Sequence, residues 1–331
     1  MTLRQSLLAI LPMSLIACGS SGGGDDVVIP EGQHYHFVVD STTVPANSTE
    51  ARNEGLDLNG DKTVDNQLGD VLATLAQQGF KIQDTLTQAV DQGKIILLLD
   101  YQAADITMDT TAAGLSVLLG ENPVPPACAS ATDTVCRRHL AGTGMFDVSA
   151  SSPADAAVGG KTINGTFNGG PGKISLQIAL GSTTPIELDL IGARAQATGM
   201  SETGIMSAIL AGALSQDDLN NKVIPAIHDQ LAPLIQRDCC GLATSPGGAT
   251  CTATATPACG CTAGSTGAQI ISLFDTAIPK DCSVSIMEIT TNGFIQSLLA
   301  PDVTIDGIMA LSLGIKVTAV KGAFTVAGET P

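Results

Sequence analysis

The chain has very few aromatic residues. Among its 331 residues there is no tryptophan, and there are only two tyrosines and seven phenylalanines. Proteins that bind sugars usually stack the sugar rings on tryptophan or tyrosine side chains, so this composition disfavours a carbohydrate-binding module. The apolar residues, 44% of the chain, are therefore mostly aliphatic, which suits packed sheets and helices.

Basic residues are also scarce. Lys and Arg together number 15 against 32 Asp and Glu, which gives a formal net charge of −17. A surface with this charge repels nucleic-acid phosphates and anionic lipid headgroups, and it attracts cations such as calcium. The composition therefore excludes nucleic acid as a partner.

The sequence also lacks the motifs that mark common catalytic sites. It contains no Gly-x-Ser-x-Gly turn between a predicted strand and helix, no His-Glu-x-x-His, no glycine-rich phosphate loop and no dinucleotide fingerprint. An exported hydrolase that gathers Ser, His and Asp from distant positions stays open as an alternative. The prediction is a protein that is not an enzyme.

The N-terminal residues have the pattern of an export signal. Arg4 supplies a short positive segment, and residues 7–17 form an apolar stretch that is too short to span a bilayer. The small residue Ala17 is followed directly by Cys18. The end of this signal resembles the lipobox of bacterial lipoproteins. An ordinary signal peptide with an incidental cysteine is the alternative.

The lipobox resemblance implies an address in the cell envelope. By this resemblance, residues 1–17 are a signal peptide that is removed, and Cys18 is the lipidated N-terminus that anchors the protein to a membrane. Residues 18–30 are rich in Gly, Ser and Asp and are expected to form a flexible tether. Because Gly19 follows the cysteine, the family expectation is the outer membrane.

The eight cysteines beyond Cys18 predict four disulfides, because the count is even and the chain is exported. Cys128 and Cys136 are close together and far from the others, so they are expected to pair with each other. The other six allow fifteen connectivities, which the sequence does not distinguish: Cys239, Cys240, Cys251, Cys259, Cys261 and Cys282. A zinc cluster at these cysteines is the rival interpretation.

Hydrophobic periodicity predicts both strands and helices. Residues 174–180 and 186–190 alternate between apolar and polar around a turn with Gly and Pro, which predicts an antiparallel hairpin. Residues 311–318 repeat this pattern, and the apolar run 95–99 predicts a strand buried on both faces. Apolar residues at helical spacing between 215 and 231 predict a helix that packs against the core.

These patterns predict an α+β to mainly β fold, built on an antiparallel sheet or sandwich with a few packed helices and a disulfide-rich excursion. The expected β-rich domain covers residues 31–237. A Cys-rich segment follows at 238–282, and 283–331 form a C-terminal helix and strands that return to the main domain.

The best candidate for a binding site is the loop 57–68. Oxygen-bearing side chains occur at alternate positions, as the turn around a hard cation requires. The spacing resembles the EF-hand-like calcium loops of dockerins and thrombospondin type 3 repeats. That resemblance implies five ligands for Ca²⁺, of which Thr63 contributes its carbonyl oxygen: Asp57, Asn59, Asp61, Thr63 and Asp65.

This loop departs from the calcium pattern at two positions. Position six, usually glycine, is Lys62, and position twelve, usually a carboxylate, is Leu68. Asp70 and Glu54 are the nearest carboxylates that would substitute for the missing ligand. An acidic turn without a metal is the alternative.

The histidines give a weaker signal. His34 and His36 are two residues apart in a predicted strand, so their imidazoles share one face at a spacing that suits zinc. The sequence shows no third ligand, and solvent-facing histidines are the favoured interpretation. His139 and His228 are isolated.

The resulting functional hypothesis is a non-enzymatic cell-envelope lipoprotein, stabilised by calcium and disulfides, with a structural, adhesive or partner-binding role. A carrier of a lipid or another apolar ligand is the first alternative, because mean hydropathy is positive at +0.27 despite the acidic charge.

Overall fold

The structure is a computed structural model that describes residues 32–77, 82–130, 132–133, 136–178, 185–239, 259–278 and 280–326. The predicted signal peptide and tether, with Cys18, lie outside the described residues, as do Cys240 and Cys251. Within the described ranges, no helix is both long enough and apolar enough to cross a membrane.

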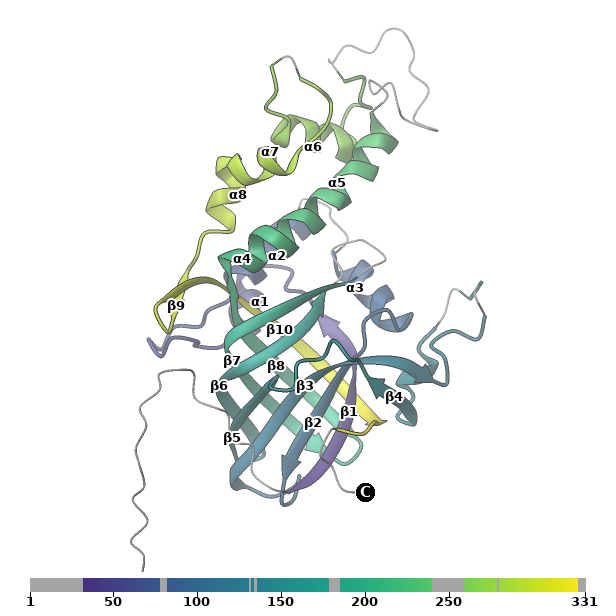
Figure 1. The fold of residues 1–331 in the computed structure, drawn as a ribbon, viewed down its shortest axis with the longest axis vertical. Helices are drawn as coiled ribbons and strands as arrows, with labels where there is room; N and C mark the ends of the chain where they lie inside the picture. Colours follow the sequence, from purple (N-terminus) through teal and green to yellow (C-terminus); the bar gives the residue numbers. More distant parts are fainter. Residues whose placement is uncertain are drawn as a thin grey trace, which may run out of the picture.

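Eight strands, each antiparallel to its neighbours, close into a barrel (Figure 1). Each strand pairs with the next one named, and β10 pairs with β1 to close the ring. In order around the barrel they are β1 (Gln33–Thr43), β2 (Leu97–Ala103), β3 (Thr110–Val124), β5 (Ala157–Ile163), β6 (Thr166–Ile178), β7 (Ile186–Ser201), β8 (Gly204–Ser215) and β10 (Ile308–Ala323). Two short strands, β4 (Gly144–Val148) and β9 (Val303–Ile305), pair with β10 outside this ring.

The closed barrel corrects one part of the predicted fold. The antiparallel sheet with packed helices is as expected, but the sheet does not form a sandwich. The C-terminal strand β10 has a partner on each side, β8 and β1, so it joins the two ends of the sheet. Closure removes the free edges that an open sheet would expose.

Large side chains fill the centre of the barrel. The rings of Tyr101 and Phe167 are fully buried and meet edge to face, with centroids 5.5 Å apart. The hydroxyl of Tyr101 shares a hydrogen bond of 2.7 Å with that of Thr162 on β5, so the polar end of the ring is satisfied. Leu99 lies two residues before Tyr101 on β2 and therefore points to the same side of the sheet, and Phe37 lies opposite it on β1. Both are also buried.

Two tight turns show why particular strand pairs form. β5 and β6 are joined by Asn164 and Gly165, with φ of 52° and 70°. β9 and β10 are joined by Asp306 and Gly307, with φ of 50° and 82°. Two consecutive residues with positive φ define a type I′ turn, whose twist matches that of antiparallel strands and which favours Asn-Gly and Asp-Gly sequences.

Helices cover one end of the barrel and extend beyond it (Figure 1). Three lie near the barrel: α1 (Ser48–Asn53), α2 (Gln67–Gln77) and α3 (Ile82–Asp91). After β8, a short α4 (Gln216–Asp218) and a π-helical turn η2 (Leu219–Val223) lead into α5 (Ile224–Asp238). Then follow α6 (Thr266–Phe274), α7 (Ile286–Thr291) and α8 (Gly293–Leu298). A 3-10 turn η1 (Arg138–Leu140) precedes β4. We call α5 to α8 the helical cap.

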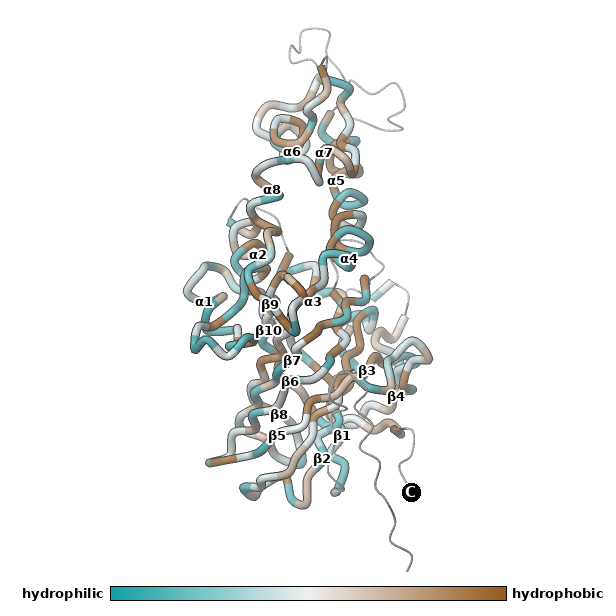
Figure 2. The backbone as a smooth tube through the Cα atoms, turned by 60° about the vertical axis from the view of Figure 1, so that its left-hand side comes forward, coloured by the Kyte–Doolittle hydropathy of each residue, from teal (hydrophilic) through white to brown (hydrophobic). Residues whose placement is uncertain are grey.

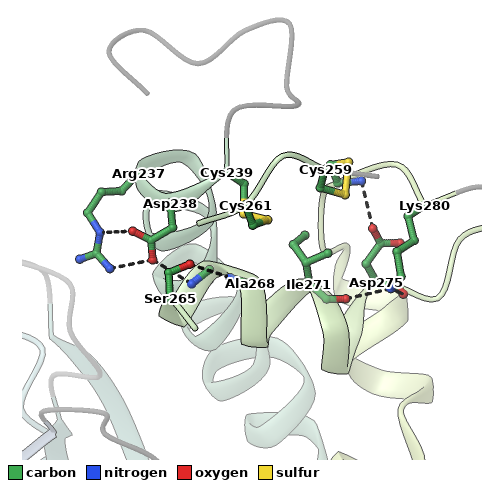
Figure 3. The surroundings of a disulfide bond; sticks show 12 residues. Arg237, Asp238, Cys239, Cys259, Cys261, Ser265, Ala268, Ile271, Asp275 and Lys280 are labelled. Carbon is green, nitrogen blue, oxygen red and sulfur yellow. Dashed lines mark hydrogen bonds and ion pairs between the residues drawn. A yellow bond between two sulfur atoms is a disulfide. The ribbon is translucent and has the colours of Figure 1, made fainter. Parts of the chain in front are cut away.

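Disulfides fix the far end of the helical cap (Figure 3). Cys239, at the end of α5, is bonded to Cys261, and Cys259 is bonded to Cys282. The ammonium of Lys280 donates to the carbonyl oxygen of Ile271 at 3.0 Å, near the C-terminus of α6. These bonds hold in place short helices that would be unstable in isolation.

The remaining described disulfide lies beside the barrel. Cys128 and Cys136 are bonded to each other, as their proximity in the sequence predicts. The described cysteines thus form disulfides and not the alternative zinc cluster. Arg137, next to Cys136, pairs with Asp91 of α3 and Asp40 of β1, so this loop is held against both elements.

Candidate functional site

An apolar cavity of about 480 Å³ lies between α2 and the helical cap. Figure 2 shows α2 and α8 on one side of this region and α4 and α5 on the other. Aliphatic and aromatic side chains from four helices form most of its wall: Leu68, Leu72 and Leu75 of α2, Ile227 and Leu231 of α5, Ile270 and Phe274 of α6, and Ile295 and Leu298 of α8.

The wall of the cavity carries no charge among the described residues. The polar groups that contribute to it are hydroxyls and amides, including Thr74, Gln230 and Gln269. Two large apolar residues of the wall, Leu273 and Phe294, are 46% and 45% exposed. They mark the side on which the cavity meets solvent.

The sequence builds this wall through amphipathic helices. Val223, Ile227 and Leu231 follow one another at steps of four residues and therefore lie along one face of the η2–α5 helix. The sequence predicts that this stripe packs into the core. In the structure all three residues line the cavity, and Val223 and Leu231 are also buried. Periodicity alone does not distinguish a filled interface from a hollow one.

Capping interactions position the short helices of the helical cap. Ser265 caps α6 by accepting from the amide of Ala268, and Asn292 caps α8. Ser285 and Glu288 form a reciprocal capping box on α7. Glu288 also accepts from the amide of Thr276, at 2.8 Å, which ties the start of α7 to the segment after α6.

The acidic loop 57–68 is closed by hydrogen bonds from its own backbone. Asp57 accepts from the amides of Gly60 at 2.6 Å and Lys62 at 2.9 Å. Asn59 accepts from the amide of Asp61 at 2.9 Å, and Asp61 from that of Thr63 at 2.7 Å. The bond from Thr63 also lowers the pKa of Asp61.

Lys62 occupies the position at which the calcium pattern usually has glycine, and its φ is +73°. The chain therefore makes the left-handed turn there despite the side chain, at a cost in backbone strain.

The base of the loop is anchored to β10. The carboxylate of Asp65 is buried and accepts from the amide of Leu58 at 2.8 Å, and burial raises its pKa. Next to it, Asn66 exchanges two hydrogen bonds with the backbone of Gly314. Gly314 also allows the backbone of Glu54 to approach β10, because a Cβ at residue 314 would lie 2.3 Å from the carbonyl oxygen of Glu54.

The five predicted calcium ligands share one loop, but their carboxylates do not converge. Among the described residues, the one group of three His, Cys, Asp or Glu side chains whose ligand atoms all lie within 4.8 Å of one another is on β1 and β2. Neither Glu54 nor Asp70, the suggested substitutes for position twelve, forms such a group with the loop. Each has a buried carboxylate oxygen without a hydrogen-bond partner in the described part of the chain.

The group on β1 and β2 contains His34, His36 and Asp100. The spacing of the two histidines was noted in the sequence, and Asp100 is the third side chain of the group, which sequence reasoning missed. Its only signal is a charged residue that interrupts the apolar run before Tyr101. This group shares no residue with the cavity wall or with the acidic loop.

Neither of the two other histidines lines the cavity. His139 is fully buried beside Phe146, and burial lowers the pKa of its imidazole. His228 is on the surface of α5 and contacts Asp229, its neighbour in sequence.

The fold and the cavity together define a class of protein: a closed antiparallel barrel that carries a disulfide-linked helical cap with an apolar cavity. Comparison of the chain with protein families, with curated proteins and with solved structures finds no match.

Proposed function

We propose that this protein binds the acyl chain of a lipid in the cavity between α2 and the helical cap. The observation that carries the proposal is the cavity itself, about 480 Å³ in volume and without a charged residue in its described wall. In this proposal the protein works in the cell envelope, non-enzymatically, and is held at the outer membrane by a lipid on Cys18.

The energetics favour a linear apolar ligand. Ligand pockets range from about 300 to 1,000 Å³, so this cavity is of ordinary size for one small molecule. Each methylene that leaves water for an apolar site contributes about 0.8 kcal/mol, and a long acyl chain presents many of them. The hydroxyl and amides of Thr74, Gln230 and Gln269 supply partners for a polar head group.

A structural or partner-binding envelope protein that is stabilised by calcium is the second candidate. It is supported by the acidic loop, where the carboxylate of Asp57 accepts hydrogen bonds from the backbone amides of Gly60 and Lys62, the fourth and sixth loop positions. Calcium in this loop would draw the side chains of Asp57, Asn59 and Asp61 inward from their backbone partners. The two candidates are compatible, because none of the five predicted calcium ligands lines the cavity.

The test begins with what the purified protein carries. Solvent extraction followed by mass spectrometry should identify about one acyl-chain lipid per protein besides the anchor. After removal of this lipid, the protein should bind cis-parinaric acid, a fluorescent long-chain fatty acid, with increased fluorescence.

Substitutions in the wall provide the control. Leu72→Glu places a charge in the cavity and should abolish binding of cis-parinaric acid, because charge burial is costly. Thr74→Phe should weaken binding by filling space. Met206→Glu is the matched control, since Met206 is 77% exposed on β8 and outside the cavity wall. Absence of both extracted lipid and probe binding in the folded wild-type protein would refute the proposal.

A further inference from the structure

His34, His36 and Asp100 form a compact cluster on the wall of the barrel. β1 and β2 are antiparallel neighbours, and their register places His36 directly opposite Asp100. His34 is two residues earlier on β1 and shares the same face. Tyr35 and Tyr101 are opposite each other on the other face, where Tyr101 contacts Phe167 inside the barrel. The cluster therefore lies on the outer face.

The donor atoms are spaced as zinc ligands are. Nδ1 of His34 lies 2.9 Å and 3.1 Å from the two carboxylate oxygens of Asp100, and Nε2 of His36 lies 3.6 Å from the nearer one. Ligand atoms about 2.0–2.1 Å from a zinc ion at the corners of a tetrahedron are about 3.3 Å apart. The observed separations lie on both sides of that value.

The surroundings favour a cation at this position. The side chain of Asp100 is only 3% exposed, and a buried carboxylate requires compensation by positive charge and hydrogen bonds. The imidazoles of His34 and His36 keep 22% and 15% of their surface exposed, which gives an ion access from solvent. Phe324 stacks on the ring of His36, with centroids 4.2 Å apart, and holds its orientation.

The backbone of the cluster is rigid. β2 is paired with β1 on one side of Asp100 and with β3 on the other, and the segment of β1 that carries His34 and His36 is paired with β2. From Phe37 onward β1 is also paired with β10. Ligands on such strands need little reorganisation when a metal binds. Figure 1 shows the start of β1 at the end of the barrel opposite the helical cap, so this site is remote from the cavity.

We propose that His34, His36 and Asp100 bind a Zn²⁺ ion through three protein ligands, with water completing the coordination. Two imidazoles and one carboxylate are a donor set typical of zinc sites that keep an open position. The ion would take the place of the hydrogen bond between His34 and Asp100. Calcium, which prefers oxygen ligands, is not expected to compete.

The test measures metal binding by the full chain. The protein is freed of metal with a chelator and then dialysed against Zn²⁺ in the presence of millimolar Ca²⁺. Metal analysis should give one Zn²⁺ per chain. Co²⁺ in place of Zn²⁺ should give visible absorption bands that indicate nitrogen and oxygen ligands in a four-coordinate site.

Variants assign the site. His34→Ala and Asp100→Asn should each weaken Zn²⁺ binding by at least about tenfold and remove the Co²⁺ bands. His228→Ala is the matched control, since it removes a histidine that also contacts an aspartate and lies on α5. Circular dichroism confirms that each variant is folded, and His36→Ala replaces Asp100→Asn if that variant is not.

The proposal fails if the wild-type protein binds no zinc under these conditions. It also fails if His34→Ala retains wild-type affinity, because the cluster then holds only hydrogen bonds between imidazoles and a carboxylate. Neither outcome bears on lipid binding, which involves none of these residues.

Discussion

The barrel and the helical cap bury their apolar side chains in different ways. Strands in a closed ring send every second side chain toward a common axis, and in this barrel Tyr101 and Phe167 meet there and fill the centre. The cap and α2 also turn apolar faces toward one another, but about 480 Å³ is left between them. Disulfides and capping interactions hold the cap helices in place, so their separation does not depend on close packing alone. Apolar composition is thus compatible with either a filled core or a ligand cavity.

The comparison predicts that loss of a ring is more costly in the barrel than in the cap. Phe167→Ala should destabilise the protein by about 3–5 kcal/mol, because it leaves a cavity in a filled interior. Phe294→Ala removes the same group from a cavity wall where it is 45% exposed, and should cost about 1 kcal/mol. Urea unfolding measures both. Equal losses would mean that the cap is packed as tightly as the barrel.

Removal of a cap disulfide should affect the cap and spare the barrel. Cys239 and Cys261 are separated by 22 residues, and opening a loop of this length lowers stability by about 3 kcal/mol. The double variant Cys239→Ala with Cys261→Ala should lose affinity for cis-parinaric acid and become sensitive to protease in the cap.

The control for this prediction is the double variant Cys128→Ala with Cys136→Ala. Its loop has a separation of only 8 residues and lies beside the barrel. This variant should retain probe binding. Loss of binding in the control alone would contradict the assignment of the cavity to the cap.

Glu54, at the junction between the helices and the barrel, should make stability depend on pH. The pKa of Glu54 is raised from the ordinary value of 4.5 to about 7, mainly by burial. The positive charge of Lys316 acts to lower this pKa, and the negative charge of Glu50 acts to raise it. The unfolded chain therefore loses this proton at lower pH than the folded protein does. The contribution of Glu54 to the free energy of unfolding is therefore most favourable below about pH 4.5, and it decreases as the pH rises to 7.

Substitution of Glu54 isolates this effect. Glu54→Gln should stabilise the protein at pH 7 by an amount on the order of 2 kcal/mol and leave it nearly unchanged at pH 4. Thermal melts from pH 4 to 8 measure the difference. Glu202→Gln, at an exposed turn, is the control and should show no such dependence. A constant offset between Glu54→Gln and wild type across this range would exclude a raised pKa.

The smallest expected effect is that of calcium on the acidic loop. A loop without its twelfth-position carboxylate should bind calcium weakly, with a dissociation constant on the order of 10⁻⁴–10⁻³ M. Millimolar calcium would then raise the free energy of unfolding by about 1 kcal/mol, or a few degrees in melting temperature. The double variant Asp57→Ala with Asp61→Ala should lose this increment. Melts in calcium and in chelator compare the two proteins, and an increment that persists in the variant would place calcium elsewhere.

Local patterns predicted several elements correctly. The alternation in residues 174–190 predicted a hairpin, and β6 pairs with β7 with Ile178 opposite Ile186. The apolar run at 95–99 leads into β2, where Leu97 to Tyr101 are all buried. The Cys128–Cys136 pair also followed from proximity. In each case either the residues that contact each other lie within about twenty residues along the chain, or the apolar residues of the segment itself show that it is buried.

Contacts between segments that are distant in the sequence could not be predicted from local patterns. Barrel closure depends on β1 pairing with β10, where Phe37 lies opposite Lys321. Asp100 joins the two histidines only because β1 and β2 pair in one register, and a shift of one residue would turn its side chain to the other face. No local pattern specifies such a register.

The sequence by itself determined the acidic charge, the scarcity of aromatics, the spacing of the cysteines and the periodicity that distinguishes strands from helices. These are properties of composition and of near neighbours along the chain. Only the tertiary structure decided that the sheet closes, that the apolar faces of α2, α5, α6 and α8 surround a cavity, and that Asp100 meets His34 and His36. The physical reason is that each of these depends on where separate segments come together, which is set by the packing of the whole chain.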